Sequence, residues 1–436
     1  MPLIRVETLR VCFGPGAPLG NARMSIARKG TSDMQTDVGP PTDRLTAARP
    51  VTRRTALQFL GLGVGVVAVA GATGLTWRAI DGGVFATGTG PAYTAWDEAD
   101  PTGQDPRNLV RAAVLAANAH RTQPWLFIVS GERIELFADM TRTIGAMDPL
   151  LRELHLSLGC ALENLVLAGP PSGLTAQVVL LPDPADATHI ATVTLTPTTA
   201  SRSPLFDAIT SRHTNRGAYD TTRPVTGQQL DALGALVDVP GTEVVWFTTD
   251  EEKRAFSNLT VRATEAIIAD PQQAADDYRW YRTDWQDIQE MKDGITIDPS
   301  GQSAFIRALA KLLPVSQEQN NSGWLTGTRD TQLPTAAAFG ALIVPDPRDA
   351  AQLVQTGRVW QRMHLAATAN GLAMQPLCQI PERIDRETSA GLDPEFGDAA
   401  AGMLPAGSHA IMTFRIGYPN ATPPPSPRRP YTDVTS

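Results

Sequence analysis

The sequence has few cysteines and no concentrated run of basic residues. Three cysteines occur in 436 residues (Cys12, Cys160 and Cys378), and their odd number and wide spacing exclude a disulfide framework and a CxxC metal site. Lys and Arg total 37 against 45 Asp and Glu, a formal net charge of −8. Because phosphate neutralisation needs clustered cations, this composition argues against nucleic-acid binding.

Motifs for metal binding and for nucleophilic catalysis are also lacking. The 6 histidines show no metal-ligand spacing, and no G-x-S-x-G motif occurs. The sequence therefore predicts no metal site and no catalytic side-chain nucleophile. Chemistry at such a protein would have to come from a bound cofactor.

The N-terminal part of the chain has the composition of an extension followed by an export segment. Residues 1–50 are rich in Gly, Pro, Ser, Thr and Arg without an apolar period, which is typical of disorder. Arg53 and Arg54 then precede a stretch without charged residues that runs to Trp77. Paired arginines before such a stretch resemble a twin-arginine export signal, whose partner is the twin-arginine translocase.

A plain membrane anchor is the alternative interpretation of residues 51–80, since about 20 apolar residues span a bilayer. Several glycines lower the hydrophobicity of the stretch, which favours the export signal. No A-x-A cleavage site is evident, so removal of the segment and its retention as an anchor both stay open. Either outcome places the body of the protein in the cell envelope, at or beyond the membrane.

A self-match at an offset of 198 residues predicts an internal duplication. Eight identities occur in the same order without a gap, and Gly159 with Gly357 is one of the pairs. Each copy is predicted to be a helix that begins near Asp-Pro and ends near a Gly. Strands are expected around these helices, at 125–130, 133–137, 243–248, 338–344 and 410–416.

The predicted fold class is therefore α+β, with two related lobes at residues 100–200 and 201–432. A fusion of this kind imitates a two-fold dimer within one chain, and its ligand would lie between the lobes.

Two motifs carry a family resemblance: Thr122-Gln123-Pro124-Trp125 in the first lobe, and the stretch Ser211–Asp220 (SRHTNRGAYD) in the second. With the repeat, they make residues 105–432 resemble the nitroreductase superfamily of FMN proteins, and within it the exported, internally duplicated Acg-type branch. The resemblance implies a nitroreductase-like fold and FMN as the cofactor. It also implies that the phosphate-type motif and the QPW-type motif act on one FMN from different lobes.

Eleven residues are predicted to bind the cofactor. Arg212, Thr214 and Arg216 alternate along the chain, so an extended turn would direct two guanidinium groups and a hydroxyl to one side, where a phosphate needs them. Capping of a turn by Thr214 or Asn215, with solvated arginines, is the alternative. His213 could add a donor from the other side. Asn118 and Arg121 depart from the family pattern of the QPW-type stretch: Asn118 can still hydrogen-bond the flavin, and Arg121 faces either the N1/C2=O end of the ring or solvent. The candidates that match the resemblance are Gln123, Gln375, Pro376, Arg428 and Arg429. For Arg428 and Arg429 a solvated proline-rich tail stays open as well.

Residues 275–335 have no counterpart in the first lobe and contain several aromatic residues. In Acg-type proteins the matching insertion folds over the flavin, so this lid segment (residues 275–335) is expected to cover the ring. A peripheral helical hairpin is the alternative.

The function that this resemblance implies is an FMN-dependent oxidoreductase. It would transfer electrons from NAD(P)H or another donor, by way of the flavin N5, to a nitro compound or a quinone. The second hypothesis is a flavin-sequestering or sensing protein with little turnover, since export separates the protein from cytoplasmic NAD(P)H. A third is an envelope protein that binds no flavin.

Overall fold

The computed structural model describes residues 83–436 except residues 85 and 100–102. The predicted extension (1–50) and export segment (51–80) lie outside these residues. All described residues fall within one compact unit. No helix in the described part of the chain has the length and apolarity needed to cross a membrane.

The first sheet is built entirely from the predicted first lobe. Its strands are β1 (Trp125–Ser130), β2 (Arg133–Ala138), β3 (Leu174–Leu180) and β4 (His189–Pro197). They are antiparallel in the order β1-β2-β4-β3, with Trp125 opposite Ala138. The two strands predicted here, β1 and β2, are confirmed. β3 and β4 were not predicted.

The second sheet is built from the predicted second lobe. Its strands are β5 (Glu243–Phe247), β8 (Ala338–Val344), β9 (Ala373–Pro376) and β10 (His409–Gly417), in the antiparallel order β5-β8-β10-β9. Every residue of β8 is buried, as expected of a continuous apolar run between two neighbouring strands. The three strands predicted in this lobe are confirmed, and β9 was missed.

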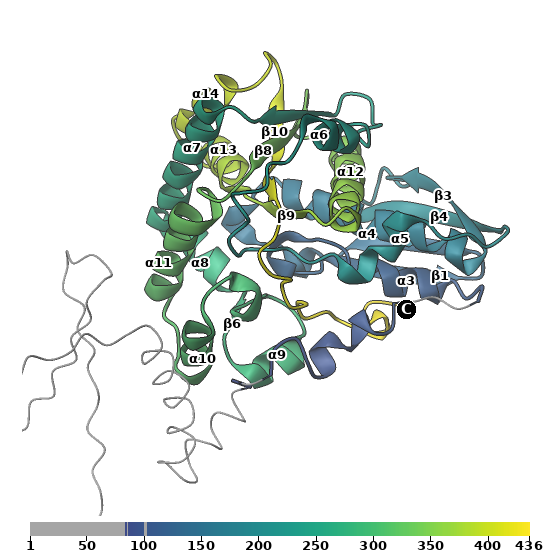
Figure 1. The fold of residues 1–436 in the computed structure, drawn as a ribbon. Coiled ribbons are helices and arrows are strands. Elements are labelled where there is room, and N and C mark those ends of the chain that lie inside the picture. Colours follow the sequence, from purple (N-terminus) through teal and green to yellow (C-terminus); the bar gives the residue numbers. More distant parts are fainter. Residues whose placement is uncertain (1–82, 85, 100–102) are drawn as a thin grey trace, which may run out of the picture. The chain divides into compact units, whose positions relative to one another are not determined.

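Helices pack against the two sheets, and alternate residues of β1 and β3 in the first sheet remain exposed (Figure 1). The α-helices are α3 (Arg107–Ala113), α4 (Arg152–Ala168), α5 (Pro204–Asp207), α6 (Gly227–Gly234), α7 (Asp250–Ala269), α8 (Pro271–Tyr278), α9 (Trp285–Met291), α10 (Ala304–Leu312), α11 (Gln317–Gly327), α12 (Ala350–Ala369), α13 (Gln379–Ala390) and α14 (Glu395–Ala401). Helix and sheet are thus mixed as the α+β prediction requires.

The two predicted repeat helices, α4 and α12, pack against each other at their matched glycines. A Cβ atom on Gly159 would lie 2.0 Å from the Val354 carbonyl oxygen, and one on Gly357 would lie 2.2 Å from the Leu156 carbonyl oxygen. Only glycine permits this close approach of two backbones. The contact is reciprocal, because residues 156 and 354 are also one repeat offset apart, as in a two-fold interface. The duplication and the lobe boundaries remain predictions.

Local sequence explains where these helices begin. The Asp148 carboxylate accepts hydrogen bonds from the amides of Glu153 (3.0 Å) and Leu154 (2.9 Å), which fixes the first turn of α4. Asp349 caps α12 by accepting from the Gln352 amide at 3.1 Å. Side chains that satisfy the free amides of a first turn stabilise helix starts.

The C-terminal segment returns from the second sheet to the first (Figure 1). After β10, the Arg428 amide donates to the Ala92 carbonyl (2.7 Å), and the Phe127 amide of β1 donates to the Val434 carbonyl (2.8 Å). This path brings the predicted residues Arg428 and Arg429 beside the first lobe.

The lid segment folds into helices and two short parallel strands, β6 (Tyr281–Arg282) and β7 (Ile295–Thr296). Residues 292–301 of the segment contact three predicted cofactor residues or their neighbours. Gly294 donates its amide to the Arg121 carbonyl (3.3 Å), and a Cβ on Gly301 would lie 2.7 Å from the Gly217 Cα atom. The segment thus contacts both predicted motifs, and its role as a lid stays a prediction.

Candidate functional site

The phosphate-type motif forms an irregular loop after the short 3-10 helix Ile209–Ser211. Asn215 shapes this loop: its carbonyl Oδ1 accepts from the Gly217 amide (2.9 Å), and its Nδ2 donates to the Ala421 carbonyl (2.8 Å). Asn215 thus caps the turn, as the alternative interpretation allowed. The arginines on either side are not freely solvated, however, as that interpretation required: Arg212 is buried, and Arg216 is half-buried with its Nη1 atom excluded from water.

Arg212 and Arg428 donate to neighbouring carbonyls at the end of α3. Arg212 is 2% exposed and its Nη2 donates to the Leu115 carbonyl at 3.0 Å. Arg428 is 3% exposed and its Nη2 donates to the Ala116 carbonyl at 3.2 Å. The Nε atoms of both arginines are buried without a hydrogen-bond partner. The fold thus brings residues of the second lobe and of the C-terminal segment to one place on the first lobe.

Trp96 lies between the motif and the C-terminal segment. The His213 ring meets the Trp96 ring edge-on at 4.5 Å, and the Arg428 guanidinium lies 5.1 Å from the same ring. The Nδ1 atom of His213 is buried without a partner, and burial beside Arg212, Arg428 and Arg121 lowers the pKa of His213 to about 3. His213 is therefore neutral at pH 7. Thr214 is half-buried beside it.

The QPW-type stretch is held in an unusual backbone conformation. His120, Arg121 and Gln123 all have positive φ angles, of 46°, 57° and 53°. Non-glycine residues rarely adopt such angles, and they persist where the surrounding structure imposes them, often at functional sites. The Asn118 carbonyl Oδ1 stabilises this turn by accepting from the Gln123 amide at 2.9 Å.

Gln123 and Arg429 are bonded to each other and to neighbouring backbone. Gln123 is fully buried, its Oε1 accepts from the Arg429 amide (2.7 Å), and its Nε2 donates to the Lys292 carbonyl (2.8 Å). The Arg429 guanidinium donates to the carbonyls of Gln123 and Asp433. The amide of Gln123 thus joins the QPW-type turn, the lid segment and the C-terminal segment.

Four arginines form what we call the cationic cluster: Arg121, Arg212, Arg216 and Arg428. Among the described residues, none of the four has a carboxylate partner. The positive charges of Arg216 and Arg212 act on Arg121, and those of Arg212 and Arg121 act on Arg428.

Burial is the main cause of the lowered pKa of every member of this cluster. It lowers the pKa of Arg121 to about 9 and that of Arg212 to about 10, and it also lowers the pKa values of Arg216 and Arg428. Neighbouring positive charge adds to the effect at Arg121 and Arg428. An anion placed here would raise these pKa values, because its attraction for the guanidinium groups would oppose both the burial and the repulsion.

Two tyrosines lie beside the cluster. The Tyr93 hydroxyl is buried without a partner, and burial, with the Asp298 charge, raises its pKa. The pKa of Tyr281 in the lid segment is raised by burial and by the Asp277 charge. The charge of Arg121 acts on both tyrosines. Both are neutral donors at pH 7, and the Tyr93 hydroxyl is free to bind an acceptor.

Gln375 and Pro376 reach the phosphate-type loop only through Arg415. The Gln375 Oε1 accepts from the Arg415 Nε (2.7 Å), and Pro376 pairs with Phe414 in the sheet. Arg415 is fully buried and its Nη2 donates to the carbonyls of Gly217 (2.7 Å) and Asn215 (3.2 Å). Arg415 therefore fixes the loop from the strand beneath it.

Four residues beside the predicted ones were not predicted to belong to the site: Tyr93, Trp96, Arg415 and Tyr281. Tyr281 is one of several aromatic residues in the lid segment. Tyr93 and Trp96 lie in the 3-10 helix Pro91–Trp96, which precedes both predicted lobes. No motif marks them. Arg415 is a charged residue within a mostly apolar strand, and that exception to the pattern was the available signal.

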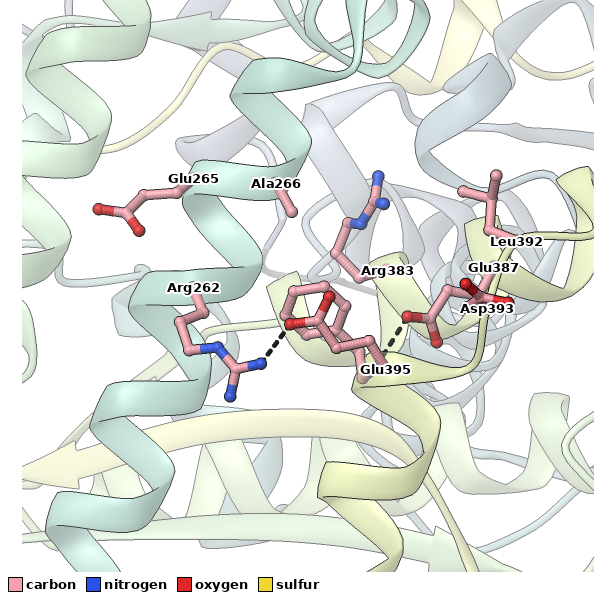
Figure 2. A pocket seen from close by; sticks show the side chains of 9 residues that line it. Arg262, Glu265, Ala266, Arg383, Glu387, Leu392, Asp393 and Glu395 are labelled. Atoms are coloured by element: carbon pink, nitrogen blue, oxygen red, sulfur yellow. Dashed lines mark hydrogen bonds and ion pairs between the residues drawn. The ribbon is translucent and has the colours of Figure 1, made fainter.

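A surface groove lies apart from the cluster, among α7, α13 and α14 (Figure 2). It is lined by Arg262, Glu265, Ala266, Arg383, Glu387, Leu392, Asp393, Glu395 and Phe396. None of these is a predicted cofactor residue. An ion pair between Arg262 and Glu395 crosses it.

Proteins with similar sequences include some that are named as nitroreductases, in agreement with the motifs. No family model matches the chain. A Mycobacterium tuberculosis protein provisionally named NAD(P)H nitroreductase is 28% identical over 355 residues, which cover 80% of this chain and 95% of that protein. An uncharacterised protein of the same organism is 25% identical, over 75% of this chain and 92% of its own length. The M. tuberculosis protein named nitroreductase acg is 33% identical over 113 residues, 25% of this chain and 34% of that protein.

Solved nitroreductases align with about half of the chain. The FMN-bound nitroreductase of Desulfitobacterium hafniense is 14% identical, covers 52% of this chain and 94% of its own, and has a TM-score of 0.33. The nitroreductase NfnB of Mycobacterium smegmatis, solved with NADPH, is 16% identical, covers 53% and 97%, and has a TM-score of 0.32.

The relatives that align along most of the chain thus confirm the resemblance that the motifs predicted. Over most of its length this chain is similar to a protein provisionally named as an NAD(P)H nitroreductase, and Acg is among the proteins it is similar to. The roles of the eleven predicted cofactor residues stay predictions.

Proposed function

We propose that the chain binds FMN with its phosphate in the cationic cluster and acts as an oxidoreductase of the nitroreductase type. The observation that carries the proposal is the set of four guanidinium groups without a carboxylate partner in the described residues. Removing a cation from water costs several kcal/mol unless a counter-charge compensates it. The cluster is therefore incomplete without an anion.

A phosphate monoester has the chemistry that the cluster lacks. It carries nearly two negative charges at pH 7 and three acceptor oxygens, and arginine forks bind it in bidentate geometry. The unpartnered atoms are donors: the Nε of Arg212 and Arg428, the Nη1 of Arg216 and the Tyr93 hydroxyl. The neutral ring of His213 can add one more donor. These residues fit the phosphate of FMN.

Bound FMN would supply two-electron chemistry at its N5 atom, which no side chain of this protein offers. The chain's own contribution is binding and electrostatics. Arg121 supplies fixed positive charge beside Tyr93 and Tyr281, and the lid segment excludes water by packing on the QPW-type turn. A nicotinamide cofactor as donor and a nitro compound or quinone as acceptor are part of the proposal, supported by the names of the relatives.

A second function, flavin sequestration or sensing with little turnover, is favoured by one observation. The lid segment is bonded to the QPW-type turn at Arg121 and Gln123 and packs on Gly217. A cover held in this way would restrict the approach of a nicotinamide or a bulky acceptor.

Retention of FMN by a double variant tests the proposal. Arg212→Ala with Arg216→Ala should weaken FMN binding by about 10- to 150-fold per residue, since each lost charge-assisted contact costs about 1.5–3 kcal/mol. The visible absorption spectrum of the purified protein measures retention. Arg223→Ala, at an exposed arginine over the Tyr418 ring, is the matched control. A folded double variant that keeps its FMN would contradict the phosphate assignment.

Anaerobic mixing with NADPH and a nitroaromatic compound separates the two functions. An oxidoreductase bleaches its flavin with NADPH and recovers the colour with the acceptor. A sequestering protein keeps its oxidised spectrum throughout.

The location of the protein is likewise a proposal. The pair Arg53-Arg54 before an uncharged stretch supports export by the twin-arginine route, with the body in the cell envelope. Fractionation of cells that express the chain tests it, and recovery of the protein only from the cytoplasm would contradict it.

A further inference from the structure

Helix α10 of the lid segment has an exposed apolar face. Phe305 is 66% exposed, Ile306 and Leu309 are each 42% exposed, and Leu313, at the C-cap, is 55% exposed. Phe305 and Leu309 are about one helical turn apart, so their side chains share one face, and Leu313 follows where the helix ends. Large apolar side chains gathered in this way mark an interaction surface more often than isolated ones do.

The opposite face of α10 is fixed to the body by charge and hydrogen bonds. The Lys311 Nζ lies 2.8 Å from the Asp298 carboxylate, and both side chains are 2% exposed. The same Nζ donates to the carbonyls of Gly83 (3.1 Å) and Ala86 (2.8 Å). A rotation that buried the apolar face would break this ion pair and both hydrogen bonds. The apolar face is therefore held outward.

The bonds of Lys311 tie α10 to Gly83 and Ala86, near the point where the described chain begins. In the sequence, the uncharged stretch Thr55–Trp77 ends six residues before Gly83. Six residues of fully extended chain span at most about 20 Å. If Thr55–Trp77 enters a membrane, α10 cannot lie far from the membrane surface.

We propose that the face formed by Phe305, Ile306, Leu309 and Leu313 docks onto a lipid bilayer and inserts at the boundary between headgroups and acyl chains. Amphipathic helices bind there with their apolar face about 5–10 Å deep. The four residues carry no charge, and Lys311 is already paired with Asp298. Binding is therefore driven by apolar burial, and it does not require anionic lipid.

Membrane docking goes beyond the proposed redox function and does not depend on FMN. It has a structural consequence for the lid segment, because α10 begins three residues after Gly301, which packs on Gly217 of the phosphate-type loop. The bilayer would hold the element that covers the cationic cluster.

An environment-sensitive label on the full chain tests the proposal. Leu309→Cys in a Cys12→Ser background is labelled with NBD, while Cys160 and Cys378 are buried in the folded protein. On phosphatidylcholine vesicles we expect at least a threefold rise in NBD emission with a blue shift, unchanged by added anionic lipid. Val179→Cys, on β3 and 54% exposed, is the matched control and should not respond.

A second variant keeps the test independent of the N-terminal segment. Adding Phe305→Ser and Leu313→Ser should abolish the response at position 309, even where the chain still sediments with vesicles. Absence of an NBD response at position 309 would overturn the proposal. A high NBD signal without vesicles would also overturn it, because residues 55–77 would then cover α10. A signal that rises with protein concentration in the absence of lipid would overturn it as well, because a second copy of the chain would then cover α10.

Discussion

The molecule buries charge in two regions that differ in how the charge is compensated. The cationic cluster gathers four arginines without a carboxylate in the described residues. A second region, which we call the Arg152 network, gathers Arg152 with the carboxyl groups of Asp148, Glu153, Glu382 and Asp385. All members of both regions are buried except Arg216, which is half-buried. Only the second contains its own counter-charges.

Contacts within the Arg152 network show this compensation. Arg152 is 1% exposed, and its Nε donates to the Asp385 carboxylate at 2.7 Å and its Nη1 to the Ile411 carbonyl at 2.7 Å. Carboxyl groups outnumber arginines here, so burial and neighbouring negative charge raise the pKa of Glu382 well above its usual value and that of Asp148 to about 7. Protons, as well as Arg152, balance the charge.

The difference indicates that the buried charges of the Arg152 network stabilise the fold, whereas those of the cationic cluster bind a ligand. A network that satisfies itself holds elements together and has no need of a ligand. Arginines that repel one another raise the free energy of the folded protein without ligand. A bound anion removes this repulsion, and the free energy gained contributes to its affinity. Replacement of an arginine is therefore expected to destabilise the folded protein much more in the Arg152 network than in the cationic cluster.

The largest expected effect is the loss of Arg152. Arg152→Met should lower the free energy of unfolding by about 3–5 kcal/mol, because it leaves the Asp385 and Glu153 carboxyl groups buried without their cation. Denaturant unfolding measures the change, with FMN and without it. Adding Asp385→Leu to Arg152→Met should recover part of the loss. A change below about 1 kcal/mol would show that the network is not internally balanced by Arg152.

An intermediate effect is expected in the pH dependence of stability, with opposite signs in the two regions. The folded pKa of Glu382 lies above its unfolded value, so the folded state holds the extra proton and stability falls as pH rises above about 4.5. The folded pKa of His213 is about 3, below the unfolded value of 6.5, so stability falls as pH drops from 6.5 towards 3.

Each such group contributes at most about 1.4 kcal/mol per pH unit. Glu382→Gln should flatten the alkaline side of the stability profile, and His213→Gln should flatten the acidic side. Unfolding curves recorded from pH 4 to pH 9 measure both slopes. If either substitution leaves its slope unchanged, the pKa assigned to that side chain is wrong.

The smallest expected effect on stability is at Arg212. Arg212→Met without FMN should change the free energy of unfolding by less than about 1 kcal/mol, because losing a repelled cation offsets losing one hydrogen bond to the Leu115 carbonyl. It matches Arg152→Met in chemistry and burial. With FMN present, the same variant should lose the stabilisation that bound ligand gives the native protein. If Arg152→Met and Arg212→Met destabilise the protein equally without FMN, the two regions do not differ in how their buried charge is compensated.

Much of the fold could be predicted where the signal is local. The repeat helices α4 and α12, the strands β1, β2, β5, β8 and β10, and the mixed α+β class follow from periodicity and from Asp and Gly at helix ends. The strand β9 was missed because it is only Ala373–Pro376, and its pairing with β10 defines it. Nothing within such a short segment distinguishes a strand from a loop.

The sequence predicted several residues that the fold brings together at the candidate site, but it did not predict the contacts that these residues make. The motif residues Arg212, Arg216 and Arg428 were named from their positions in the chain. That Gln123 bonds to the lid segment and to the C-terminal segment was not foreseen, because both partners lie more than 160 residues away. Tyr93 was missed because no motif marks it, and Arg415 was missed although a charged residue in a mostly apolar strand was an available signal.

The sequence by itself determined which residue types were available: an excess of acidic residues overall, paired arginines ahead of an uncharged stretch, a repeated helix, and a motif with alternating arginines. Only the tertiary structure decided that four of the arginines meet away from any described carboxylate, while Arg152 meets several. The physical reason is that Coulomb energies and desolvation depend on distance and on the exclusion of water. Neither quantity is set by neighbours in the chain.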